Sequence, residues 1–154
     1  MRGVSKLLFL ILLISSVVQS KKYYFTFYVD LICRVPNRAT FAYNAQFFDR
    51  DVVILNDDDS IGKPHISRSP IGNAEFRVTG MLTGDELWSD FFNVKMVLYH
   101  NCNRENEEVK LDINLLPLFE ISKLSDDKYY QYHLTRDITE LSGEVNHNRN
   151  LVQN

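Results

Sequence analysis

A two-residue alternation of apolar and polar side chains, repeated along most of the chain, constrains its fold more than any other feature. The alternation is clearest over residues 24–33, where apolar side chains occupy every second position and Tyr24, Tyr28 and Asp30 lie between them. This period turns one set of side chains to each side of a β-strand, and one buried side beside one solvated side is typical of an antiparallel sheet. The apolar repeat of an amphipathic helix is almost entirely missing.

The same signal recurs in short segments that are separated by turns. Further alternating strands are expected over residues 41–47, 74–78, 92–100 and 109–115, and the short apolar stretches 51–55 and 129–134 are expected to be strands as well. The stretch 60–72, which contains glycines and prolines, is expected to be a loop, residues 83–90 a loop or a single helical turn, and residues 145–154 a polar, frayed tail. The pattern predicts an all-β sandwich or barrel with at most one short helix, in one domain over residues 21–144.

Residues 1–20 have the pattern of a secretory signal peptide. A basic start with Arg2 and Lys6 precedes an apolar run from Leu7 to Ile14, and the small residue Ser20 suits a cleavage site. The run is short for a membrane span, which needs about 20 apolar residues, and no later segment is apolar enough to cross a bilayer. We therefore expect cleavage after Ser20 and a secreted, extracellular product, with an uncleaved signal anchor as the alternative.

The net charge argues against one large class of partner. The whole chain has 17 basic and 20 acidic residues, a formal net charge of −3, and removal of Arg2 and Lys6 with the signal peptide would leave a net charge near −5. A surface that binds nucleic acid needs clustered positive charge. We therefore expect no nucleic-acid partner.

The chain has two cysteines, which an exported protein most simply joins in one disulfide. Cys33 lies on the apolar side of the first strand, and Cys102 continues the apolar side of strand 92–100 if that strand runs through Asn101. Because two apolar sides meet in the core of a sandwich, the two sulfurs are expected to approach each other. Closing a loop of about 70 residues would stabilise the fold by about 4 kcal/mol in the chain-entropy estimate.

His100 raises two alternatives for the second cysteine. Residues two positions apart share one side of a strand, so His100 and Cys102 could both reach a zinc ion, but two ligands are too few and the other histidines show no ligand spacing. A Cys–His nucleophile pair would need an orienting group and a cleft, neither of which the sequence reveals. The disulfide is the favoured interpretation, and we expect no metal, cofactor or catalytic residue.

Two acidic segments are weaker candidates. Residues 56–60 read NDDDS but lack the spacing and the distal glutamate of a helix–loop–helix calcium site, so a solvated turn is favoured. Asp85, Glu86 and Asp90 lie around Trp88, and paired carboxylates there would suit a sugar-binding or hydrolase surface. Acidic residues in the loops of a sandwich more often face water, and this is the interpretation that we favour.

Large aromatic residues supply the candidate contacts with a partner. Trp88, close to Phe91, is either a lid on the core or a contact residue. Tyr23, Tyr24 and Tyr28 are assigned to the polar side of the first strand, where tyrosine suits a half-wet interface. The candidate contact residues are Trp88, Phe91, Tyr24 and Tyr28.

Five motifs occur in order behind the export signal. They are DLIC at 30–33, FFDRD at 47–51, GNAEFRVTG at 72–80, VKMVLYHNCN at 94–103 and ITELSGE at 138–144. Together they resemble the nematode-type transthyretin-like family of secreted proteins over most of residues 25–144, and the Tyr-His-x-Cys element is the most specific. The resemblance implies a transthyretin-like (prealbumin-like) sandwich of two antiparallel sheets and a disulfide between Cys33 and Cys102.

Members of that family largely lack an assigned biochemical activity, and their suggested roles are extracellular recognition of proteins or cell-surface lipids. The resemblance therefore implies a non-enzymatic protein that binds an extracellular protein or a lipid headgroup. One alternative is a carrier of a small apolar ligand. A less favoured one is an enzyme of the hydroxyisourate-hydrolase type, whose Tyr-Arg-Gly-Ser motif this chain lacks. The sequence does not decide whether the chain forms a homo-oligomer.

Overall fold

The structure is a computed structural model that describes residues 21–50, 58–83, 90–121 and 127–148. Within these ranges it is all-β, with eleven strands and no helix, and therefore no helix that could cross a membrane. The strands are β1 (Lys22–Cys33), β2 (Thr40–Asp49), β3 (Asp59–Ser60), β4 (His65–Pro70), β5 (Gly72–Thr83), β6 (Phe91–Phe92), β7 (Val94–His100), β8 (Val109–Leu116), β9 (Phe119–Glu120), β10 (Lys128–Asp137) and β11 (Gly143–Asn148). The expected signal peptide at 1–20 and the expected strand at 51–55 lie outside the described residues.

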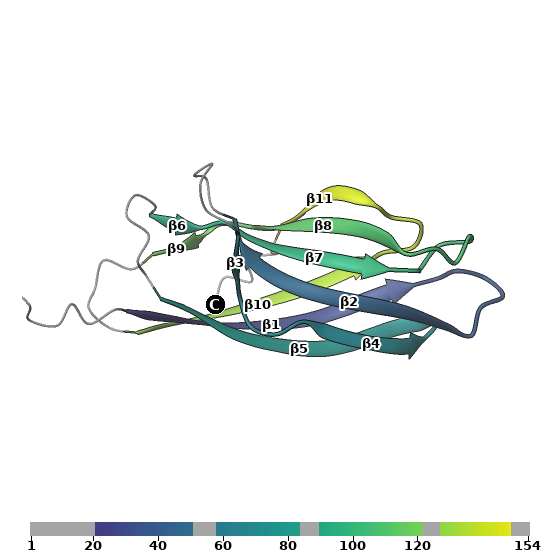
Figure 1. Cartoon of the computed structure of the whole chain (residues 1–154), viewed down its shortest axis with the longest axis horizontal. Helices are drawn as coiled ribbons and strands as arrows, with labels where there is room; N and C mark the ends of the chain where they lie inside the picture. Colours follow the sequence, from purple (N-terminus) through teal and green to yellow (C-terminus); the bar gives the residue numbers. More distant parts are fainter. Residues whose placement is uncertain (1–20, 51–57, 84–89, 122–126, 149–154) are drawn as a thin grey trace, which may run out of the picture.

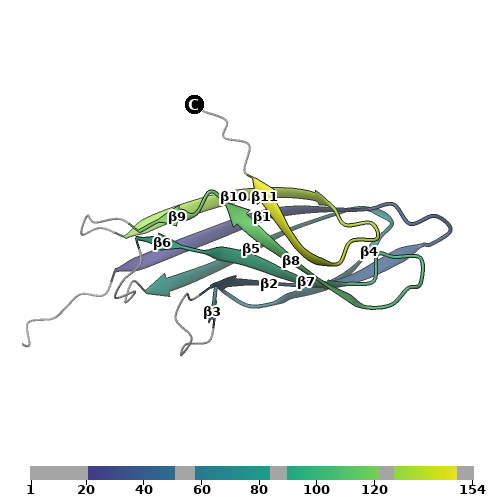
Figure 2. The same ribbon diagram turned by 90° about the horizontal axis from the view of Figure 1, so that it is seen from above.

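Two main sheets pack as a β-sandwich (Figure 1). The three-stranded sheet has the order β10-β1-β5, and the six-stranded sheet has the order β11-β8-β7-β2-β3, with β4 also paired to β2. Figure 2 shows the long strands running along the long axis of the molecule, with the small β6–β9 pair near one end. The all-β sandwich predicted from the alternation is confirmed.

Two of the strand pairings are parallel, which the prediction of antiparallel sheets did not include. β10 pairs with β1 in parallel, and β11 pairs with β8 in parallel, whereas the remaining pairings are antiparallel. Alternation along a strand specifies which side is buried but not the direction of the neighbouring strand. Each of the two main sheets is therefore mixed, with one parallel pair among antiparallel pairs.

The core lies between the two sheets because alternate side chains of each strand point inward. In β1 the inward side chains include Phe25, Phe27 and Val29, all of them buried. Phe27 stacks on Phe47 of β2, with 3.9 Å between the ring centroids, and so joins the two sheets directly. The inward sides of β7 and β8 complete this layer with Val94, Met96, Leu98, Leu111, Ile113 and Leu115.

The stretch 60–72 is not the loop that its composition predicted. Residues His65–Pro70 form β4, which pairs antiparallel with β2 from Ala45 opposite His65 to Thr40 opposite Pro70. No side chain of β4 is fully buried, so the segment lacks the apolar alternation by which strands were identified. Pro70 is the last residue of the strand, a position at the end of an edge strand that proline tolerates.

The last strand extends into the segment predicted as a tail. β11 occupies Gly143–Asn148 and pairs with β8 from Gly143 opposite Leu111 to Asn148 opposite Leu116. Its sequence, GEVNHN, has only one strongly apolar residue, so pattern alone identified it as polar tail. The strand places residues 145–148 in the six-stranded sheet.

The two cysteines are at disulfide-bonding distance, as expected. The sulfurs of Cys33 and Cys102 are 1.98 Å apart, their Cα atoms are 5.9 Å apart, and both residues are fully buried. Cys33 ends β1, and Cys102 follows β7 by two residues, so the bond links the three-stranded sheet to the six-stranded sheet.

Candidate functional site

The outward side of the three-stranded sheet is the candidate site, and we call it the tyrosine face. It consists of the side chains that the alternation of β1, β5 and β10 turns away from the core. Their members are Tyr24, Thr26, Tyr28 and Asp30 of β1, Glu75, Arg77, Thr79 and Met81 of β5, and Tyr129, Gln131, His133 and Thr135 of β10. Every member on β5 and β10 is exposed, so this face is open to solvent.

Strand register arranges the tyrosine face in rows that cross all three strands. Tyr24 lies between Met81 and Tyr129, and its ring stacks on that of Tyr129 with 4.8 Å between centroids. Tyr129 and Met81 have exposed fractions of 73% and 44%, which is high for such large side chains. This first row therefore presents a wide, partly apolar surface to the solvent.

The third row, which follows the row of Thr79, Thr26 and Gln131, combines an aromatic pair with a charge. Tyr28 lies between Arg77 of β5 and His133 of β10. The rings of Tyr28 and His133 stack with 4.6 Å between their centroids and 12° between their planes. In the next row Asp30 lies between Glu75 and Thr135, so two carboxylates occupy directly opposed positions on adjacent strands.

A shallow, open depression of about 400 Å³ lies across these two rows. Its lining side chains on the tyrosine face are Tyr28, Asp30, Glu75, Arg77, His133 and Thr135. The other lining residues, Val29, Phe76 and Leu134, belong to the inward set of the same strands and form the floor. The depression is therefore an open hollow with a mixed charged, aromatic and apolar lining, and it is not an enclosed apolar cavity.

The charged groups of the depression are not neutralised by one another. No ion pair among the described residues involves Asp30, Glu75 or Arg77. One carboxylate oxygen of Asp30, Oδ1, is inaccessible to solvent and has no hydrogen-bond partner among the described residues. Buried carboxylate oxygens normally accept hydrogen bonds, so this group is incompletely satisfied.

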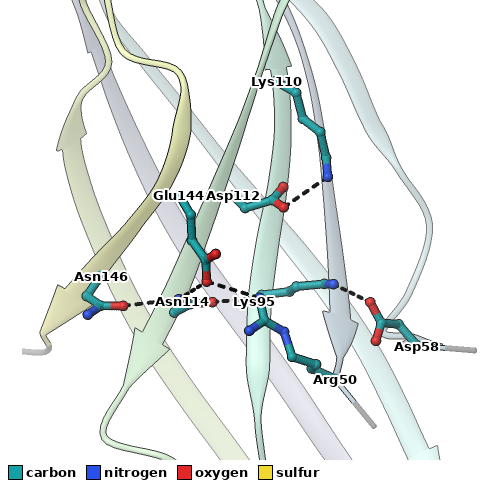
Figure 3. Close-up of polar contacts among 8 residues, drawn as sticks. All are labelled: Arg50, Asp58, Lys95, Lys110, Asp112, Asn114, Glu144 and Asn146. Carbon is teal, nitrogen blue, oxygen red and sulfur yellow. Dashed lines mark hydrogen bonds and ion pairs between the residues drawn. The ribbon is translucent and has the colours of Figure 1, made fainter. Parts of the chain in front are cut away.

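The outward side of the six-stranded sheet differs because most of its charged side chains pair with one another (Figure 3), with Arg68 of β4 as an exception that is in no ion pair among the described residues. Asn114 donates to Glu144 at 2.8 Å and Arg50 donates to Glu144 at 3.4 Å, and these two contacts lower the pKa of Glu144, while Asn114 also accepts from Arg50 at 3.1 Å. Lys95 pairs with Asp58 in the same region. Lys110 pairs with Asp112 at 2.9 Å, and Asn114 also contacts Asn146 at 3.0 Å. Among the described residues of this outward side, Oδ1 of Asp112 is the one buried side-chain oxygen without a hydrogen-bond partner.

The structure places the predicted contact residues in three different situations. Tyr24 and Tyr28 lie together on the tyrosine face, as their side of the strand predicted. Phe91 is 46% exposed but belongs to β6, in the separate two-stranded sheet, and Trp88 lies outside the described residues. The assignment of Tyr23 to the polar side was wrong, because it shares the inward side of β1 and packs edge-on against Phe92 with 4.9 Å between ring centroids.

The remaining members of the tyrosine face were not predicted as contact residues. Met81, Tyr129 and His133 lie beside β1 only because β5 and β10 pair with it. No local pattern in the sequence marks that pairing. The apolar stretch 129–134 was predicted as a strand, and in any strand residues 129 and 133 lie on the same side.

His100 has a structural position in the core. It is 1% exposed, and its Nδ1 accepts a hydrogen bond of 3.1 Å from the backbone N–H of Cys102. Burial lowers the pKa of His100 to about 4, and the backbone carbonyl of Leu141 partly opposes this shift. Since the sulfur of Cys102 is bonded to Cys33, it serves neither as a thiolate nucleophile nor as a zinc ligand here.

The acidic candidates form no metal site within the described ranges. No group of three or more His, Cys, Asp or Glu side chains there could hold a metal ion. Asp58 pairs with Lys95, and Asp59 and Ser60 form β3, while the rest of the segment 56–60 lies outside the described residues. Asp85 and Glu86 also lie outside them.

Comparisons with known proteins found no match, either to a family model or to a curated protein sequence. The likeness to transthyretin-like proteins therefore rests on the motifs of the chain itself. We therefore infer a function from the geometry of the outward faces of the two sheets.

Proposed function

We propose that this chain is a secreted, non-enzymatic β-sandwich that binds an extracellular partner through the tyrosine face. The observation that carries the proposal is the contrast between the two sheets. On the six-stranded sheet Lys95, Lys110 and Glu144 are in ion pairs, and Arg68 of β4 is an exception, whereas on the tyrosine face Asp30, Glu75 and Arg77 make no ion pair among the described residues. Polar groups left without partners beside exposed aromatic rings are what a contact surface requires.

The same proposal includes the transthyretin-like family and extracellular location. The sandwich and the proximity of Cys33 and Cys102 agree with what the resemblance implies. A disulfide also suits an oxidising compartment, and the first 20 residues have the composition of an export signal. These features support the assignment without identifying a ligand.

We favour a protein surface as the partner, with a cell-surface lipid headgroup as the second candidate. Tyrosine combines a large apolar body with a polar tip, and it is enriched at protein interfaces for this reason. Tyr24, Tyr28 and Tyr129 lie on one broad face instead of surrounding a deep pocket. A carrier of a small apolar ligand would be better served by an enclosed apolar cavity, and the depression is open and includes charged side chains in its lining.

An enzymatic role receives less support from the same residues. Catalytic groups commonly combine a shifted pKa with a position in a cleft. The largest pKa shifts belong to His100, lowered to about 4, and Tyr130, raised to about 12, and burial is the main cause of both. Neither residue lines the depression.

The proposal is tested by capture of partners from extracellular fluid of the source organism with the immobilised mature protein. The wild type is compared with a Tyr24→Ser/Tyr129→Ser variant, which removes the stacked pair of the first row. Tyr99→Ser is the matched control, because Tyr99 is a half-buried tyrosine on the outward side of β7.

Proteins retained by the wild type and the control but lost from the double variant support the tyrosine face as the contact surface. Co-sedimentation with vesicles of neutral or anionic phospholipid, lost in the same variant, would indicate the lipid candidate instead. Equal capture by all three proteins contradicts the proposal.

A further inference from the structure

We propose that the depression on the tyrosine face binds a cationic group, the primary ammonium of a lysine side chain or the guanidinium of an arginine side chain on a protein partner. The cation would lie between the carboxylates of Asp30 and Glu75, beside the ring of Tyr28. The inference rests on the proposed function, since it names the chemistry that the contact surface recognises.

The first support is the position of the two carboxylates. Asp30 and Glu75 are directly opposed in the antiparallel β1–β5 pair, and both line the depression. Directly opposed residues have Cβ atoms about 4.5–5.5 Å apart, and like charges at such positions repel. A cation between them converts this repulsion into two attractive contacts.

The second support is the incomplete hydrogen bonding of Asp30. Its Oδ1 is shielded from solvent and has no donor among the described residues, and no ion pair there involves its carboxylate. A shielded carboxylate without a donor carries a desolvation cost that a nearby positive charge reduces. A cation that contacts the other oxygen would supply this charge.

The third support is the selectivity of the surroundings. Two carboxylates and a single guanidinium, that of Arg77, line the depression, so its formal charge favours a cation over an anion. The stacked rings of Tyr28 and His133 form an aromatic wall on the same row as Arg77. A cation over the face of a tyrosine ring is attracted by the ring quadrupole, and a guanidinium can also stack on it.

The net negative charge of the whole chain also favours a positively charged partner. A mature chain with a net charge near −5 attracts positively charged partners at a distance. This long-range attraction is not specific to the depression. The test therefore has to separate binding in the depression from attraction by the overall charge.

The experiment is a two-dimensional NMR titration of the mature, disulfide-bonded protein with small probes. The probes are N-acetyl-lysine methylamide and N-acetyl-arginine methylamide, with N-acetyl-norleucine methylamide as the neutral control and N-acetyl-glutamate methylamide as the acidic control. The proposal predicts saturable shifts of the backbone amides of residues 28–30, 75–77 and 133–135 with the basic probes alone.

The variants Asp30→Asn and Glu75→Gln locate the site. Each is expected to weaken binding of the basic probes roughly two- to fivefold, as for the loss of one partly exposed ion pair. Glu108→Gln is the matched control, because it removes one exposed carboxylate from the turn after β7. It makes the net charge less negative by one, as Asp30→Asn and Glu75→Gln each do. Thermal unfolding of each variant verifies that it is folded.

Equal binding of basic and acidic probes, or binding unaffected by both depression variants, overturns the proposal. So does an equal weakening by Glu108→Gln, which would indicate general charge attraction. If the basic probes do not bind while capture of partners still depends on Tyr24 and Tyr129, this inference fails and the proposed function stands. If the Tyr24→Ser/Tyr129→Ser variant captures partners as well as the wild type does, the tyrosine face is not the contact surface, and this inference fails with the proposed function.

Discussion

At the scale of single residues, the opposed carboxylates of β1 and β5 have a consequence for stability that needs no ligand. We predict that Glu75→Gln stabilises the free protein by about 0.2–1 kcal/mol, since it removes a like-charge pair from directly opposed positions. Urea unfolding at pH 7 and low salt measures the change, and added salt should reduce it. Glu108→Gln serves as control, and a destabilised Glu75→Gln variant would mean that Glu75 has a favourable partner instead.

His100 makes a second residue-scale prediction, which concerns pH. Its folded-state pKa of about 4 lies below the ordinary value of 6.5, so between these values the unfolded chain binds a proton that the folded protein does not. Stability is therefore complete above pH 6.5 and falls as the pH decreases toward 4, by roughly 3 kcal/mol at about 1.4 kcal/mol per pH unit. Burial also lowers the pKa of His147, which adds to the loss in the upper part of this window.

The measurement is the free energy of urea unfolding at pH 7 and at pH 4.5. A His100→Gln variant should lose most of the difference between the two values, even if its stability at pH 7 is lower. An unchanged pH dependence in that variant would assign the effect to other groups.

At the scale of the elements, the strands with an apolar side were predictable and those without one were not. β1, β2 and β8 alternate buried and half-buried residues along most of their length, so local pattern was enough to place Tyr24 and Tyr28 outward. β4 and β11 contain no fully buried residue, and only pairing with β2 and β8 makes them strands. The rows of the tyrosine face join residues such as Tyr24 and Tyr129, 105 positions apart, and no local signal encodes such a pairing.

The connection between β10 and β11 gives a prediction at this scale. The hydroxyl of Tyr132 in β10 lies 3.0 Å from three groups, which are the backbone carbonyls of Leu116 and His147 and the Nδ1 of His147. Tyr132→Phe leaves these partly buried groups without that partner, and we expect a loss of about 1–3 kcal/mol in unfolding free energy. Tyr129→Phe, at an exposed position of the same strand, should change it by less than about 0.5 kcal/mol.

Hydrogen exchange distinguishes a local effect from a global one. In the Tyr132→Phe variant, the amides of β11 should lose more protection than those of β7, because the hydroxyl contacts the backbone of β11 directly. Equal losses in both strands would contradict a specific connection between β10 and β11.

At the scale of the whole molecule, the two outward faces differ in how far their charges are paired. On the six-stranded sheet, most outward charged groups have a partner on the same face, as the contacts among the ends of β2 and β3 and the strands β7, β8 and β11 show. The three-stranded sheet holds its inward side in the aromatic core and leaves its outward charges available. We expect the proposed recognition through one face to depend on a fixed position of the two sheets relative to each other.

The bond between Cys33 and Cys102 is the covalent link that maintains this position, and it carries the last prediction. It joins the end of β1 to the segment after β7 across 69 positions of sequence, so replacing both cysteines with alanine frees a long loop in the unfolded chain. We expect a loss of up to about 4 kcal/mol in the free energy of urea unfolding. The wild type in the presence of a reducing agent should approach the same value, and peptide mapping without reduction should recover the two cysteines in one linked fragment. The contrary outcome has two parts. The double alanine variant would lose less than about 1 kcal/mol, and the wild type would carry free thiols at Cys33 and Cys102. Packing such as that between Phe27 and Phe47, rather than the disulfide, would then hold the sheets together.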